Sequence, residues 1–230
     1  KYSLIISSSM EDKVNFSTAF MGQYKSISIT GYPRNDALFN IKKTDNFIIT
    51  YLPTFRDSAH NSVDLFSPYN FDIELWEQKF LDLNVTLNIK MHPVNKPKSI
   101  LLSTFKDCKR IRFIDEMDAV EILSNTDILI TDYSSVYFDY LLLDKPIIFS
   151  PFDYEKYVTK DREFYYNYHE VTPGPKCRDW TEVLEWIERF KKDSMLYSEK
   201  RKKVRGKFHK YQDARSCERV YGEIIKLNNN

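Results

Sequence analysis

The chain has 230 residues, of which 42% are hydrophobic and 29% are charged, and its formal net charge is +1 at pH 7. This length allows one large domain or one and a half small ones, and the near-neutral charge argues against general binding of nucleic acids. Only five glycines are present, and neither of the glycine-rich phosphate-binding motifs of nucleotide-binding proteins occurs.

The three cysteines, Cys108, Cys177 and Cys217, lie far apart in the sequence. Their odd number and spacing are typical of neither a zinc site nor a disulfide framework, and they fit a reducing compartment. No apolar run approaches the roughly 18–20 residues that are needed to span a bilayer. We therefore expect a cytoplasmic location. Because the sequence starts at Lys1 inside a strand-like stretch, we also interpret it as a piece of a longer protein.

Short apolar runs rich in Ile, Val or aromatic residues predict six strands, at residues 2–7, 47–53, 85–91, 110–114, 127–131 and 146–150. Helical patterns lie between them, at residues 11–22, 71–83, 117–125 and 135–144. Beyond Pro151 the sequence becomes loop-like, and two or three helices follow between Trp180 and Leu227. This alternation of strands and helices predicts an α/β fold with a Rossmann-like, doubly wound parallel sheet.

Polar stretches follow four of the predicted strands. They are "PTFRD" (53–57), "KMHP" (90–93), "IDEMD" (114–118) and "TDYSS" (131–135). In open α/β sheets, ligands bind beyond the carboxyl ends of the strands, so these stretches are expected to converge along one edge. Their convergence is more informative than any of them alone.

Each candidate residue also has a purely structural interpretation. A lone histidine such as His92 at a strand end is more often structural, but its position beside Lys90 on the ligand edge favours binding. Thr54 and Arg56 could merely end a strand, although a cation on this edge suits a diphosphate.

Ser134 and Ser135 stand at the start of a predicted helix, where they could act as N-caps and stabilise it by roughly 1 kcal/mol. The same position offers free N–H groups and hydroxyls to a phosphate, and the two roles are compatible. Asp139 lies one helical turn further on. It could be a solvated surface charge, or it could accept hydroxyls from a bound ribose or polyol.

Four stretches carry a resemblance to a known family: "GYPRND" (31–36), "YLPTFRD" (51–57), "KMHP" (90–93) and "ITDYSSVYFDYLLLDKPIIF" (130–149). They resemble the CDP-glycerol glycerophosphotransferase family, which comprises teichoic-acid polymerases and primases and related capsule polymerases. The resemblance covers nearly the whole chain in consistent order. It implies a GT-B-like fold, in which two Rossmann-like domains enclose the active site.

Within that fold the chain resembles the C-terminal, donor-binding half. Residues 1–30 would be the end of an N-terminal Rossmann-like domain and a linker, 31–178 the nucleotide-binding domain, and 179–230 helices that close the fold.

The resemblance implies transfer of glycerol or ribitol phosphate from CDP-glycerol or CDP-ribitol to an acceptor hydroxyl, with release of CMP. The acceptor would be a polyol-phosphate polymer or a lipid-linked molecule, and no cofactor or metal is implied. Nine residues would form the donor site: Arg34, Pro53 and Thr54 at its border, Lys90, Met91 and His92 at the CDP end and phosphates, Ser134 and Ser135 at the diphosphate, and Asp139 to complete it.

One departure concerns the catalytic base, which in that family is a histidine followed by glycine on the N-terminal domain. The four histidines here, His60, His92, His169 and His209, precede Asn, Pro, Glu and Lys. The base is therefore expected to lie outside this chain.

The basic stretch 191–210 permits two interpretations. It could be a solvated helix face, or it could contact a polyanionic phosphate polymer or an anionic membrane surface. The second interpretation adds peripheral attachment to the inner face of the cell membrane as an option.

Two other functional classes stay open. A glycosyltransferase or epimerase of the same fold would use similar residues against a UDP- or GDP-sugar. A non-catalytic donor-binding module would bind the donor without turning it over.

Overall fold

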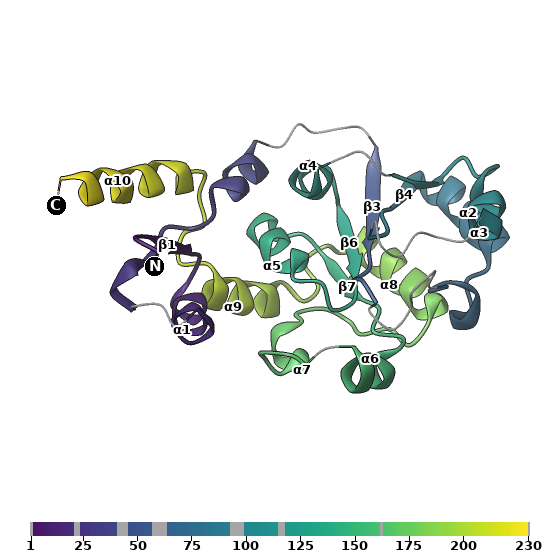
Figure 1. The fold of residues 1–230 in the computed structure, drawn as a ribbon. Coiled ribbons are helices and arrows are strands. Elements are labelled where there is room, and N and C mark those ends of the chain that lie inside the picture. Colours follow the sequence, from purple (N-terminus) through teal and green to yellow (C-terminus); the bar gives the residue numbers. More distant parts are fainter. Residues whose placement is uncertain are drawn as a thin grey trace.

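The computed structural model describes residues 2–20, 24–40, 46–56, 64–92, 99–114, 118–161 and 163–229. Five of the predicted strands form one parallel sheet in the order β5-β4-β3-β6-β7, which confirms the predicted fold class (Figure 1). These strands are β3 (Phe47–Leu52), β4 (Val85–Ile89), β5 (Ile111–Phe113), β6 (Ile128–Thr131) and β7 (Ile147–Phe149).

Helices alternate with these strands along the chain, and further helices follow the last strand. They are α1 (Met10–Ala19), α2 (Ile73–Leu83), α3 (Ser99–Phe105), α4 (Ala119–Ser124), α5 (Val136–Tyr140), α6 (Tyr154–Lys160), α7 (Tyr168–Val171), α8 (Trp180–Lys192), α9 (Ser198–Phe208) and α10 (Ser216–Asn228), with 3-10 turns η1 (Tyr24–Ser26), η2 (Pro33–Phe39), η3 (Ser67–Tyr69) and η4 (Leu141–Leu143). Within the described ranges, none of the helices is long and apolar enough to cross a membrane.

Both faces of the sheet are covered by apolar side chains. Ile128 and Ile130 of β6 pack in one cluster with Trp76 and Trp180, whereas Leu129 between them packs in the other cluster. Figure 1 shows α2, α3 and α8 on the first side of the sheet and α4 and α5 on the second. A strand that is buried on both faces reads as a continuous apolar run, which is why these strands could be recognised from the sequence.

The first predicted strand does not join this sheet. The part of it that forms a strand is β1 (Ile5–Ser7). This strand pairs in parallel with β2 (Ile27–Ile29), which was not predicted. Figure 1 shows β1, α1, α10 and both chain ends together at the side of the molecule away from α2 and α3. The division into residues 1–30, 31–178 and 179–230 stays a prediction.

Two close contacts join this part, which includes α10, to the rest of the molecule. Gly31 has a φ of 79°, and a Cβ placed on it would lie 2.5 Å from the Ser216 hydroxyl oxygen. Asp36 of η2 accepts hydrogen bonds from the backbone N–H groups of Ser216 and Cys217, at 2.9 and 2.8 Å. The first turn of α10 is therefore anchored on the turn that follows β2.

Replacement of Gly31 should test this anchoring. Gly31→Ala imposes a left-handed backbone on a residue with a Cβ and crowds Ser216, so we expect the free energy of unfolding to fall by about 1 kcal/mol or more. Gly206→Ala in α9 is the matched control, because open space surrounds Gly206. That change should raise stability by up to about 1 kcal/mol through helix propensity. Urea denaturation of both variants measures the difference, and equal stability of the two would contradict the proposed strain.

Candidate functional site

The parallel strands β3 and β6 lie side by side at the centre of the sheet. The strands that follow each of them in the chain extend the sheet on opposite sides of this pair. β4 and β5 extend the sheet on the side of β3, whereas β7 extends it on the side of β6. A crevice for ligands opens at such a reversal, beyond the carboxyl ends of the strands. Leu52 and Thr131 pair as the last residues of β3 and β6, so the segments that follow them leave the sheet together. A cleft of about 980 Å³ lies at these segments.

Most of the predicted site residues line this cleft. Seven of the nine do so: Arg34, Pro53, Thr54, His92, Ser134, Ser135 and Asp139. They come from η2, from the segments that follow β3 and β4, and from α5 with the two residues before it. The structure therefore brings together residues that lie as far apart in sequence as Arg34 and Asp139.

The other two predicted residues do not line the cleft. Met91 is 8% exposed and packs in the core cluster that contains Leu87 and Ile89. Alternation along β4 places these three side chains on one face, a signal that was readable in the sequence. Lys90 is half-buried, and its backbone N–H donates to the carbonyl of Tyr51 at 3.0 Å. Some parts of the predicted stretches lie outside the described residues, namely Asp57, Pro93 and 115–117. His60 also lies outside them.

Arg56 is a structural residue, and the interpretation that it offers its charge to a diphosphate is wrong. Its side chain is 3% exposed. It donates to Asp132 at 2.7 Å, to Asp153 at 2.8 and 3.0 Å, and to the carbonyl of Thr54 at 2.6 Å. Burial alone would lower the pKa of Arg56, but the charge of Asp132 and the contacts with Asp153 outweigh it, so the pKa is raised.

Asp132 uses both carboxylate oxygens to hold the strand ends together. Oδ2 accepts from Arg56, while Oδ1 accepts from the backbone N–H groups of Thr54 and Tyr133, at 2.7 and 2.6 Å. The hydroxyl of Tyr133 donates to Asp153 at 2.9 Å. Burial, together with the charges of Asp153 and Asp132, raises the pKa of this hydroxyl, which therefore stays protonated as a donor. Sequence reasoning missed this network because Asp153 lies far along the chain.

The two serines at the start of α5 do little capping. Ser135 occupies the N-cap position, but its side chain makes no capping hydrogen bond. The hydroxyl oxygen of Ser134 accepts a long bond, 3.4 Å, from the N–H of Val136. Nearby, the hydroxyl oxygen of Thr54 is buried and has no hydrogen-bond partner among the described residues. Polar groups with unused capacity therefore gather at the strand ends, as expected where a polar ligand binds.

Asp139 is not a solvated surface charge. Its side chain is 14% exposed and accepts from Arg34 at 3.0 and 3.2 Å and from the amide of Asn35 at 2.7 Å. Arg34 is 58% exposed, and its guanidinium lies 4.7 Å from the ring centre of Tyr32. The pair thus connects η2 with α5 at the cleft.

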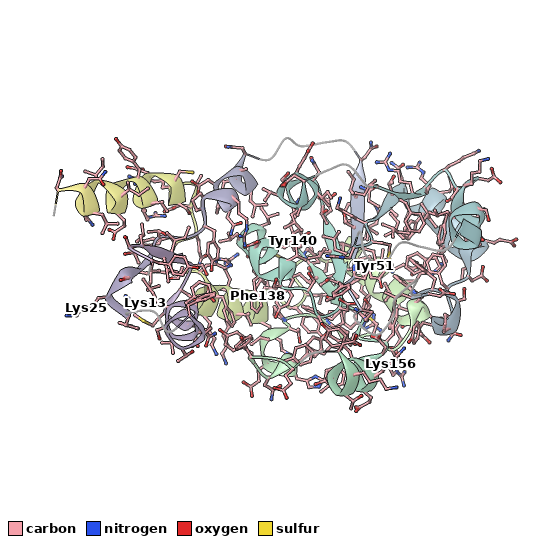
Figure 2. All side chains as sticks on the ribbon, viewed as in Figure 1. Lys13, Lys25, Tyr51, Phe138, Tyr140 and Lys156 are labelled. Atoms are coloured by element: carbon pink, nitrogen blue, oxygen red, sulfur yellow. The ribbon has the colours of Figure 1, made fainter. Side chains whose placement is uncertain are left out.

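The remaining walls are mainly aromatic. His92 is exposed at the end of β4, and its ring centre lies 5.1 Å from that of Phe55. Phe138 of α5, which is labelled in Figure 2, packs against Phe208 of α9 with ring centres 4.4 Å apart. Within the part of the chain that the structure describes, no group of three or more His, Cys, Asp or Glu side chains could hold a metal ion.

A doubly wound parallel sheet with hydroxyl, imidazole and guanidinium groups around a crevice at its switch point defines a domain of the Rossmann kind. The model of the family described as CDP-Glycerol:Poly(glycerophosphate) glycerophosphotransferase matches residues 1–226. The chain therefore belongs to this family, and the resemblance seen in its motifs is confirmed.

Curated relatives agree with this assignment. The chain is 32% identical over 231 residues to the teichoic acid glycerol-phosphate transferase of Staphylococcus aureus, a match that covers 92% of this chain and 57% of that protein. It is 31% identical over 236 residues to the teichoic acid ribitol-phosphate polymerase TarL of the same species, covering 95% of this chain and 40% of TarL. The chain thus spans between 40% and 57% of the length of these two relatives.

Solved structures show the same fold. A structure of the wall teichoic acid polymerase TagF with CDPG superposes with a TM-score of 0.80 and 28% identity, covering 99% of this chain and 59% of that one. A UDP-N-acetylglucosamine 2-epimerase from Listeria monocytogenes superposes with a TM-score of 0.56 and 16% identity, covering 96% of this chain and 58% of that one. The second likeness concerns the fold alone.

The buried network predicts a specific pH dependence of stability. Burial alone would raise the pKa of Asp153, but hydrogen bonds and charge from Arg56 hold it below its usual range. Ionised Asp153 therefore stabilises the fold fully above its unfolded pKa of about 3.9, and this contribution is lost as the pH falls through the lowered folded pKa. Asp153→Asn should cost about 3 kcal/mol at pH 7 and progressively less below pH 4.

Urea denaturation at pH 7 and at acidic pH measures this difference. Asp107→Asn is the control, because Asp107 is exposed and should contribute little at either pH. A cost for Asp153→Asn that stays constant as the pH falls would contradict the assignment of its charge to this network.

Proposed function

We propose that this chain forms the donor-binding part of an enzyme that transfers glycerol phosphate or ribitol phosphate from a CDP-polyol to an acceptor hydroxyl and releases CMP. The product would be a teichoic acid or a similar capsule polymer. The observation that carries the proposal is the cleft at the β3–β6 switch point, where Thr54, His92, Ser134 and Ser135 converge in a member of this family. The names of its relatives, a glycerol-phosphate transferase and a ribitol-phosphate polymerase, support both donors.

The diphosphate would lie against the strand ends. Ser134 and Ser135 offer hydroxyls that the start of α5 does not use for strong capping, and the Thr54 hydroxyl oxygen is buried without a partner in the described residues. His92 adds an imidazole, and Arg34 adds an exposed guanidinium whose contact with Asp139 can rearrange. This set of donors suits phosphate oxygens, and the aromatic walls suit the nucleoside.

Phosphoryl transfer depends on positioning and on stabilising charge more than on covalent chemistry by the protein. The acceptor oxygen would form a bond to the β-phosphorus while the bond from that phosphorus to the bridging oxygen breaks. CMP then leaves with the bridging oxygen, and the proton of the acceptor hydroxyl passes to a base. We propose that this base lies in a part of the protein outside this chain.

The cations of the basic stretch 191–210 differ in their surroundings, because some are buried in contacts and others are exposed. Arg201 is fully buried and donates to the carbonyls of Leu196 and Ser194, and Arg205 contacts Asp144 at 3.3 Å. These two arginines hold α9 on the domain and are not offered to a partner.

Three exposed lysines of α9 form a stripe. Lys200, Lys203 and Lys207 are exposed and recur at helical spacing along one flank of the helix. The ammonium group of Lys207 lies 5.6 Å from the ring centre of Tyr166, a residue that lines the cleft. We propose that this stripe guides a polyanionic acceptor towards the cleft, with attachment to an anionic membrane as the alternative role.

His92 provides the test of the donor site. His92→Ala should weaken binding of CDP-glycerol by about 1.5–3 kcal/mol if a charge-assisted contact is lost, and by less if the imidazole is neutral. CMP should lose less, because it lacks the second phosphate. His169→Ala is the control, since His169 is exposed and does not line the cleft. Calorimetry with CDP-glycerol, CDP-ribitol, CMP and UDP-glucose measures these affinities.

The same titrations distinguish the alternatives. Tighter binding of UDP-glucose than of either CDP-polyol would favour a sugar-nucleotide enzyme of the same fold. Binding of CDP-glycerol by a longer protein that still produces no polymer would favour a non-catalytic donor-binding module.

The lysine stripe predicts a salt-dependent affinity for a polyol-phosphate oligomer. Changing Lys200, Lys203 and Lys207 together to Gln should lower this affinity at least about tenfold at low salt, because each lysine releases counterions on binding. The control changes the exposed Lys106, Lys156 and Lys160 instead; Figure 2 labels Lys156 on α6. Loss of binding to anionic vesicles with unchanged oligomer affinity would assign the stripe to the membrane.

A further inference from the structure

Four segments that are distant in sequence meet at the cleft. They are the start of α1, the residue before η2, the middle of α5 and the end of α9. Each contributes a polar side chain to the cleft lining, namely Asp12, Tyr32, Asp139 and His209. The Ser8 hydroxyl contacts both Asp12 and the carbonyl of Phe208, the residue before His209, at 2.5 and 2.7 Å, so these groups lie close together. The charges of Asp12 and Asp139 both act on the buried ring of His209.

Asp12 is held in one orientation by its neighbours. Its Oδ2 atom accepts hydrogen bonds from the hydroxyl of Ser8 at 2.5 Å and from the hydroxyl of Tyr32 at 3.1 Å. Among the described residues, Oδ1 has no hydrogen-bond partner and the carboxylate has no cationic partner. Burial and the charge of Asp12 raise the pKa of Tyr32, so its hydroxyl stays protonated and keeps donating. Asp12 is therefore an oriented carboxylate with one oxygen available to a ligand.

His209 adds an acceptor of a second kind. The ring is 4% exposed, and its Nε2 atom donates to the carbonyl of Phe138 at 2.7 Å. Burial lowers the pKa of the ring, which favours the neutral form with the proton on Nε2. The other nitrogen, Nδ1, has no hydrogen-bond partner within the described part of the chain. A neutral histidine held in this way presents an acceptor nitrogen.

These groups select for hydroxyls and against phosphate. A carboxylate without a cationic partner accepts O–H donors but repels a phosphate dianion, and Asp139 in the same cleft already has Arg34 as its partner. The cleft is also lined by Ser134, Ser135 and His92, whose hydroxyls and imidazole suit phosphate oxygens. The cleft thus contains separate groups for the hydroxyls and for the phosphate of a polyol phosphate.

We infer that Asp12, supported by Tyr32 and Ser8 and joined by His209, forms a subsite for the hydroxyl groups of a polyol phosphate whose phosphate lies towards Ser134 and Ser135. The inference rests on the proposed function and names the residues that read the polyol. The polyol can belong to the donor or to the end of an acceptor chain, because both present the same hydroxyls beside a phosphate.

The test compares ligands with and without the polyol. Asp12→Ala should weaken binding of CDP-glycerol about tenfold and leave binding of CDP, which has the same phosphates, within about twofold. Asp12→Asn keeps a neutral acceptor oxygen for Ser8 and Tyr32, so it checks the result if the alanine variant folds poorly. Glu155→Gln in the first turn of α6 is the control, because Glu155 is an exposed acid that does not line the cleft.

A second arm identifies the source of the polyol. The protein is saturated with CMP and titrated with glycerol 3-phosphate, which represents an acceptor end. Loss of affinity for CDP-glycerol alone supports a donor subsite, and loss for glycerol 3-phosphate alone supports an acceptor subsite.

Equal losses for CDP and CDP-glycerol, or no loss with any ligand, would overturn the subsite while the proposed function stands. Failure of the unmodified protein to bind any CDP-polyol would overturn both.

Discussion

The site depends on one buried ion network. Arg56 follows β3, Asp132 follows β6 and Asp153 follows β7, so their contacts tie the ends of three strands together. Charges this deeply buried are tolerated only when they are paired and fully hydrogen-bonded. The arrangement of the loops at the switch point satisfies all three charges. A change in the path of the chain after β3 that removed Arg56 would leave the carboxylates of Asp132 and Asp153 without this partner.

The consequences reach the cleft directly. Because Asp132 accepts from the N–H of Thr54, the hydroxyl of Thr54 is held at the bottom of the crevice without a partner of its own in the described residues. Tyr133, bonded to Asp153, stacks on Tyr157 with ring centres 4.0 Å apart. The network thus fixes the position of Ser134 and Ser135, which follow Tyr133 in the chain. Arg56, Asp132 and Asp153 do not line the cleft themselves, yet they hold residues that do.

The fold could be predicted from the sequence because its central strands are local signals. Runs such as 127–131 and 146–150 are apolar throughout, as expected for strands covered on both faces. Once the strands were known, the rule that ligands bind at their carboxyl ends located Thr54, His92, Ser134 and Ser135. By contrast, β2 (Ile27–Ile29) has a serine between its two isoleucines and polar residues around it, so it does not form an apolar run.

The rest of the site could not be predicted because it depends on long-range contacts. Arg56 looks like any cation at a strand end until Asp153 is seen beside it, and Asp12 looks like an acid in the first turn of a surface helix. His209 lies in a basic stretch, where nothing local indicates that its ring is buried against Phe138. Met91 is the exception, since the alternation of Leu87, Ile89 and Met91 already indicated a core position.

The ion pairs of Arg56 and of Arg34 differ in strength. Arg56 is buried beneath the site, whereas Arg34, which reaches across to Asp139, is 58% exposed. An exposed ion pair of this kind contributes about 0–1 kcal/mol, far less than the cost of breaking a buried one. The contact between Arg34 and Asp139 can therefore be lost at little cost to the fold. The contacts of Arg56 and Asp132, which hold the strand ends, involve neither of these two residues.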